Sequence, residues 1–113
     1  MTPEQRLATF RGFVAQRPDD PFARYSLAMA LRSAGDREAA AAEFQELRRR
    51  ASDYVPTYLM LGQLLGELGR WPEAAQAYLD GIAAAERRGD GHARGELAAA
   101  LETLRQEGHG TTP

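Results

Sequence analysis

The sequence has no cysteine, no lysine and no long apolar run. Without cysteine, the chain cannot form a disulfide, a thiolate metal site or a cysteine nucleophile. The longest nearly uncharged segment, residues 54–66, is well short of the roughly 20 residues that span a bilayer. Residues 1–10 carry charge early and contain no apolar run before a cleavage site, unlike a signal peptide. These absences favour a cytoplasmic protein without membrane insertion.

Signatures of catalysis are also missing. The sequence contains no phosphate-binding glycine loop, nucleophile elbow or dinucleotide fingerprint. His92 and His109 stand in a predicted loop and tail, with no metal-ligand spacing around them. The acidic pairs at 19–20 and at 43 and 46 suit helix capping and solvated helix faces better than general acid and base catalysis. We therefore expect no enzyme, no metal and no cofactor.

The charge balance argues against a nucleic-acid partner. All fourteen cations are arginine, which we attribute to genomic base composition and hence to a bacterial source. Residues 1–54 hold nine arginines and eight acids, and residues 55–113 hold five arginines and eight acids. Neither half is basic enough to bind nucleic acid. The run of arginines at 48–50 is predicted to complement the carbonyl end of a helix dipole.

Helix signals alternate with short breaks, and no segment shows the period-2 pattern of a half-buried strand. Prolines near helix starts, aspartates at caps and glycines just past helix ends place the boundaries. We predict an all-α chain of about six helices. Their expected ranges are 3–17, 21–34, 37–51, 55–68, 71–88 and about 92–107.

A shift of 34 residues superposes the second and third helices on the fourth and fifth. The matching positions are apolar or small and recur at helical spacing, whereas the polar positions differ. These signature positions are Leu27, Ala28, Leu31, Gly35, Ala40 and Phe44 in the first copy, and Leu61, Gly62, Leu65, Gly69, Ala74 and Tyr78 in the second.

The same period extends to both flanking helices. Phe10 and Phe13 take the places of Phe44 and Leu47, so the first helix is the second half of a further unit. The "LAAAL" of 97–101 repeats the "LAMAL" of 27–31, so the last helix is a first half that caps the array. We predict one domain over 1–107, followed by a flexible tail over 108–113. Its parts are a half repeat at 3–18, full repeats at 21–54 and 55–88, and a capping helix at about 92–107.

The signatures L-A-x2-L with A-x3-F and L-G-x2-L with A-x3-Y resemble the tetratricopeptide repeat (TPR) family. The sequence departs from that family at Arg24, where a large aromatic residue is expected and where the second copy has Tyr58. The resemblance implies a right-handed α-solenoid of antiparallel helix pairs. It also implies a concave wall formed by the first helix of each pair, on which protein partners bind.

By this family geometry, the second and fourth helices expose more apolar side chains than the core needs. An excess apolar patch usually marks a contact site, and methionine and tyrosine suit an adaptable one. The predicted groove residues are Phe22, Tyr25, Met29, Arg32, Leu59, Met60, Gln63 and Gly66.

The groove predicts an adaptor or scaffold that binds a hydrophobic or amphipathic peptide. Two alternatives remain: a homodimer or larger homo-oligomer that buries the same patch, and a chaperone of the secretion-system type. Coverage of the patch by another helix of the chain is a further structural explanation. Co-chaperones of this family clamp a C-terminal carboxylate with several cations, but the corresponding places include Tyr25, Met29 and Met60. An apolar ligand is therefore favoured over a charged terminus.

Three glycines in "GQLLGELG", residues 62–69, receive different interpretations. Gly62 is predicted to lie where the two helices of a unit cross closely, and Gly69 to end a helix as Gly35 does. Gly66 corresponds to Arg32 and is expected to face the groove, where its missing side chain lets a ligand approach the backbone.

Overall fold

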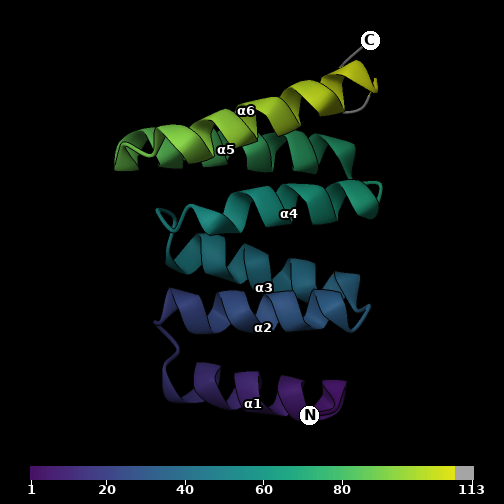
Figure 1. The fold of residues 1–113 in the computed structure, drawn as a ribbon, viewed down its shortest axis with the longest axis vertical. Helices are drawn as coiled ribbons and strands as arrows, with labels where there is room; N and C mark the ends of the chain where they lie inside the picture. Colours follow the sequence, from purple (N-terminus) through teal and green to yellow (C-terminus); the bar gives the residue numbers. More distant parts are fainter. Residues whose placement is uncertain (109–113) are drawn as a thin grey trace. The chain divides into compact units, whose positions relative to one another are not determined.

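The computed structural model describes residues 1–108 and contains six α-helices within them (Figure 1). The predicted tail after residue 108, including His109, lies outside the described residues. The helices are α1 (Pro3–Gln16), α2 (Pro21–Ser33), α3 (Arg37–Arg50), α4 (Pro56–Glu67), α5 (Trp71–Arg88) and α6 (Gly91–Gln106). The prediction of an all-α chain is confirmed over the described part.

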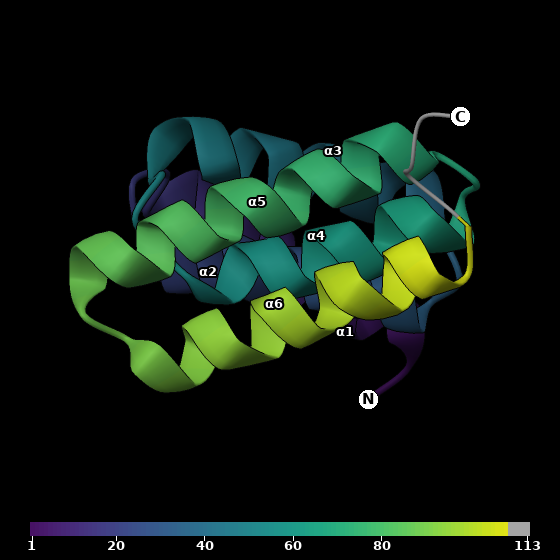
Figure 2. The ribbon, with the colours of Figure 1, turned by 90° about the horizontal axis from the view of Figure 1, so that it is seen from above.

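The chain divides into two compact units, Met1–Ala51 and Ser52–Pro113. In the first unit, α2 packs against both α1 and α3. In the second unit, α5 packs against α4 and α6, and α4 also contacts α6. Consecutive helices within each unit are joined by short turns and run in opposite directions, as α5 and α6 show in Figure 2.

Side-chain caps fix most helix starts. Thr2 and Gln5 form a reciprocal capping box at α1. Asp36 caps α3 by accepting the Ala39 amide at 3.1 Å, as the sequence predicts. Gly35 and Gly69 adopt φ values of 87° and 75°, which only glycine adopts without strain. The predicted helix ends at these two glycines are therefore explained by the backbone.

The repeat signature forms the core of both units. Ala28, Ala40 and Phe44 in the first unit have no exposed surface. Gly62 lies directly under Tyr78, because a Cβ on Gly62 would approach Cδ1 and Cζ of the ring at 2.6 and 2.7 Å. The prediction that small residues permit a close helix crossing at Gly62 is confirmed.

A second close crossing in unit 2 was not predicted from the sequence. A Cβ on Gly81 of α5 would come within 2.5 Å of the Cβ of Tyr58 on α4 and 3.0 Å of the Leu97 methyl carbons on α6. Gly81 therefore lets α5 pass between its two neighbours. The helix α4 is held against α5 at Gly62 and again at Gly81.

The two repeats differ in how they fill one core position. Tyr58 is buried in α4 and donates its hydroxyl to the Ser52 carbonyl at 2.5 Å. The equivalent Arg24 of α2 is also buried and makes a 3.0 Å ion pair with Glu43 of α3. Glu43 is thus only partly solvated, with 26% of its side chain exposed, and it neutralises the buried guanidinium of Arg24.

Glu46 accepts hydrogen bonds from Arg49 and Arg50 at the end of α3, at 2.5 and 2.6 Å. These bonds lower the pKa of the Glu46 carboxyl to about 2. Because folding lowers the Glu46 pKa, the hydrogen bonds from Arg49 and Arg50 stabilise the helix end at pH values above the ordinary glutamate pKa. That contribution is lost as the pH falls toward 2.

A carboxyl titration followed by NMR should show the pKa of Glu46 well below the ordinary glutamate value, at about 2. In the Arg49→Gln, Arg50→Gln variant its pKa should return toward the ordinary range. An unchanged low pKa in that variant would mean that another group holds the charge.

Candidate functional site

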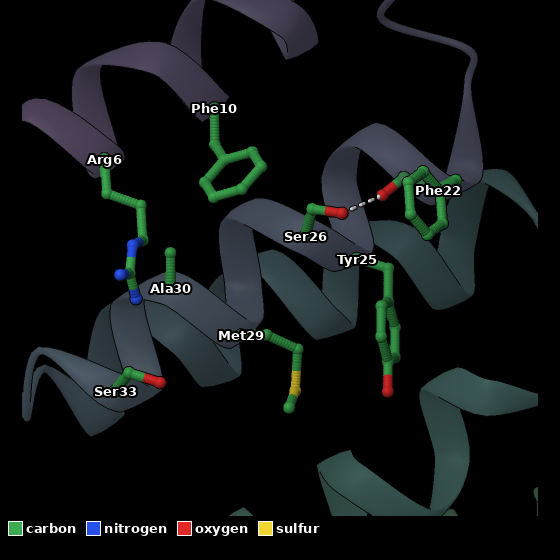
Figure 3. Close-up of a pocket in the computed structure, with 8 residues that line it drawn as sticks. All are labelled: Arg6, Phe10, Phe22, Tyr25, Ser26, Met29, Ala30 and Ser33. Carbon is green, nitrogen blue, oxygen red and sulfur yellow. Dashed lines mark hydrogen bonds between the residues drawn. The ribbon is translucent and has the colours of Figure 1, made fainter. Parts of the chain in front are cut away.

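One face of α2 presents apolar side chains to an open pocket of about 340 Å³ (Figure 3). Phe22 is 64% exposed, and Tyr25 and Met29 are half-buried. Helix α1 supplies Arg6 and Phe10 on the other side of the pocket. The structure thus brings together three of the predicted groove residues, and α1 adds two that were not predicted.

Tyr25 has a structural role as well as an exposed edge. Its ring packs edge-on against Phe44 with the ring centroids 5.8 Å apart. Burial raises the pKa of the Tyr25 hydroxyl, and the positive charge of the predicted groove residue Arg32 opposes this shift. Tyr25 therefore belongs partly to the core of unit 1, whereas Phe22 does not.

A second pocket of about 240 Å³ also lies between α1 and α2. It shares Phe10, Phe22 and Ser26 with the first and adds Phe13, Arg17, Asp20 and Ala23. Phe13 is 47% exposed and lies edge-on to Phe10 at a centroid distance of 6.0 Å. We call the two pockets together the α1–α2 notch.

The sequence contained a signal for the α1 side of this notch. Phe10 and Phe13 occupy the places of Phe44 and Leu47, which are buried in a complete repeat. Among residues 1–108, no first helix of this half repeat packs over these rings. Their exposure therefore follows from the repeat pattern, although the groove prediction did not include them.

Unit 2 carries the other four predicted groove residues. Leu59 and Met60 are half-buried on α4, and Gln63 is exposed. The expectation for Gly66 needs correction, because a Cβ there would lie 3.3 Å from the indole of Trp71. The space left by the missing side chain is therefore taken by Trp71 of the same unit, and a ligand is not needed to explain this glycine.

No group of three or more histidine, cysteine, aspartate or glutamate side chains in residues 1–108 is placed to hold a metal ion. His92 lies in the first turn of α6, not in a loop, with its Nε2 3.3 Å from a carboxylate oxygen of Glu96. No described helix is both long and apolar enough to cross a membrane.

No protein-family model matches the chain, and a search of curated proteins finds no match. Solved structures do match it. A tetratricopeptide repeat domain protein from Salinibacter ruber, solved by NMR, is 37% identical with a TM-score of 0.73, and the match covers 76% of this chain and 87% of that one. This chain belongs to the tetratricopeptide repeat family. The TPR signature at 27–44 and 61–78 therefore identified the family correctly.

Two further structures agree with this assignment. A crystal structure of a TPR domain protein from Salinibacter ruber is 36% identical over 76% of this chain and 97% of that chain, with a TM-score of 0.73. A protein from Bordetella parapertussis is 27% identical over 89% of this chain and 88% of that chain, with a TM-score of 0.75. The TPR fold is a helical repeat fold on which protein-interaction surfaces are built.

Proposed function

We propose that this TPR protein is a non-catalytic adaptor that binds a hydrophobic or amphipathic peptide of a protein partner. The observation that carries the proposal is the exposure of Phe22 beside Tyr25 and Met29 at an open pocket. Burying such side chains against a partner removes apolar surface from water at about 25 cal/mol per Å². The similar proteins from Salinibacter ruber and Bordetella parapertussis are bacterial, and we extend the proposal to an adaptor of the bacterial cytoplasm.

The proposed binding surface lies in unit 1 and consists of Phe22, Tyr25, Met29 and Arg32. The predicted residues Leu59, Met60 and Gln63 of unit 2 are a separate candidate surface, and Gly66 is left out because Trp71 fills the space beside it. Phe22 and Met29 are the most informative residues to change. Tyr25 is less suitable, because truncating it would also remove its packing on Phe44.

The double variant Phe22→Ala, Met29→Ala should lower partner capture while leaving the helical circular dichroism unchanged. Capture is measured by crosslinking and quantitative mass spectrometry from the native cell, relative to the unchanged chain. Leu79→Ala is the matched control, because Leu79 is 42% exposed on α5 and lines none of the pockets described above. Equal capture by the double variant and the control would contradict the proposal.

Light scattering separates the homo-oligomer from the adaptor. The adaptor should be a monomer at tens of micromolar. A dimer that dissociates in the Phe22→Ala, Met29→Ala variant would instead favour the homo-oligomer, which buries the same patch against itself.

A further inference from the structure

The helix pair α1–α2 corresponds by the repeat to the pair α5–α6. Phe10 and Phe13 of α1 stand at the places of Tyr78 and Gly81 of α5. The "LAMAL" of α2 stands at the place of the "LAAAL" of α6. Unit 2 therefore shows how a third helix packs onto a helix pair of this kind.

In unit 2 the third helix is α4, which contacts both α5 and α6. It places Gly62 against the Tyr78 ring and the Tyr58 Cβ against Gly81. As a result Tyr78 is only 5% exposed, and α5 buries six residues.

In unit 1 no helix takes the corresponding place on α1. Helix α1 has no buried residue, and Phe13 is 47% exposed. The two pockets of the α1–α2 notch lie along the contact of α1 with α2, the kind of contact that α4 covers between α5 and α6. The notch is therefore a surface onto which a further helix could pack, and none of the described helices covers it.

The notch also has a definite charge pattern. Arg6 lines one pocket, and Arg17 lines the other together with Asp20, whose carboxylate accepts the Phe22 amide at 3.0 Å as the cap of α2. Within residues 1–108 neither guanidinium forms an ion pair. Eleven residues at 1.5 Å per residue separate the two arginines by about 16 Å along α1. An occupant with carboxylates three turns apart would therefore meet both cations.

We propose that the α1–α2 notch binds an amphipathic α-helix of a partner protein, with acidic side chains near both ends of its apolar stripe. This proposal rests on the proposed function and names the class of peptide. The stripe should have a small residue at its centre, because Phe10 of α1 stands at the place of Tyr78, whose ring packs against Gly62 in the middle of α4. The helix completes the repeat of which α1 is the second half.

The test uses a fluorescent 16-residue amphipathic peptide with a central alanine and two glutamates eleven positions apart. Binding to the full chain is followed by anisotropy, and peptide helicity by circular dichroism. We expect saturable binding with a gain of peptide helicity. Peptides with lysines in place of the glutamates, or with a central proline, should bind at least about tenfold more weakly.

Protein variants locate the site. Phe13→Ala should weaken binding at least about tenfold, and Leu79→Ala should leave it unchanged. Arg6→Ala and Arg17→Ala should each weaken binding about three- to fivefold. Arg11→Ala is the matched control, since Arg11 is an exposed arginine of α1 that lines neither pocket.

Three outcomes would overturn the proposal: no binding, equal binding of the proline peptide, or equal loss in Arg11→Ala and Arg17→Ala. If the peptide fails while Phe22→Ala, Met29→Ala still lowers partner capture, the helix proposal is wrong and the proposed function stands. If partner capture is also unaffected, both are wrong.

Discussion

Replacing Gly62 with leucine is expected to destabilise the protein by about 3 kcal/mol, since a bulky side chain overpacks a close crossing. Even a Cβ at this position would lie 2.6 Å from Cδ1 of the Tyr78 ring. The better helix propensity of leucine, worth roughly 0.8 kcal/mol, offsets only part of this cost. The melting temperature should fall by at least about 10 °C.

Gly95→Leu is the matched control for this prediction. Gly95 lies in α6, and a Cβ there would meet no heavy atom within 4 Å. The same substitution should therefore leave the melting temperature unchanged or raise it, because only the helix-propensity term acts. A similar loss of stability in both variants would show that the crossing at Gly62 is not tightly packed.

Removing the carboxylate of the buried ion pair in unit 1 should also be costly. Glu43→Ala leaves the guanidinium of Arg24 in a position where only 8% of the residue is exposed. An unpaired buried charge loses its water without gaining a partner, so we expect a loss of about 2–3 kcal/mol. Chemical denaturation measures this loss. The Glu46→Ala variant should show a much smaller one, because its partners Arg49 and Arg50 are 67% and 35% exposed and remain solvated.

The second repeat supplies the compensating change. Tyr58 and Ala77 of unit 2 stand at the places of Arg24 and Glu43, and both are buried. The double variant Arg24→Tyr, Glu43→Ala should therefore recover most of the stability lost in Glu43→Ala. A double variant less stable than Glu43→Ala would contradict the equivalence of the two repeats at this position.

The helices and the repeat could be predicted because their signals are local. Proline, aspartate and glycine mark helix ends through their own backbone and capping chemistry, as at Asp36 and Gly35. The 34-residue period follows from small and apolar residues that recur on the same helix faces. These features depend on the nearest turns of the chain and are therefore legible in one sequence.

The contacts of individual side chains between helices could not be predicted in the same way. The repeat pattern predicts that Gly66 faces an open groove, but Trp71 of the next helix fills the space beside it. Arg24 interrupts an apolar position, but Glu43, nineteen residues later, neutralises it. Each outcome depends on the reach of a side chain on a different helix, which neither periodicity nor composition specifies.

The candidate site also contains residues that local sequence signals predict and residues that depend on contacts between helices. Phe22, Tyr25 and Met29 were predicted because their spacing places them on one face of a helix. Arg6 and Phe13 were missed because their exposure arises where no helix within residues 1–108 packs across α1. An apolar residue at a core position of a half repeat is the signal that would have located them.

The most direct test of the account is an NMR titration of the isotope-labelled chain with the acidic amphipathic peptide. The account predicts shift changes concentrated at Phe10, Phe13, Phe22 and Met29, with the exposed Leu79 of α5 unaffected. Changes centred on α5 or α6, or spread evenly over both units, would contradict the central claim that the α1–α2 notch is where a partner binds.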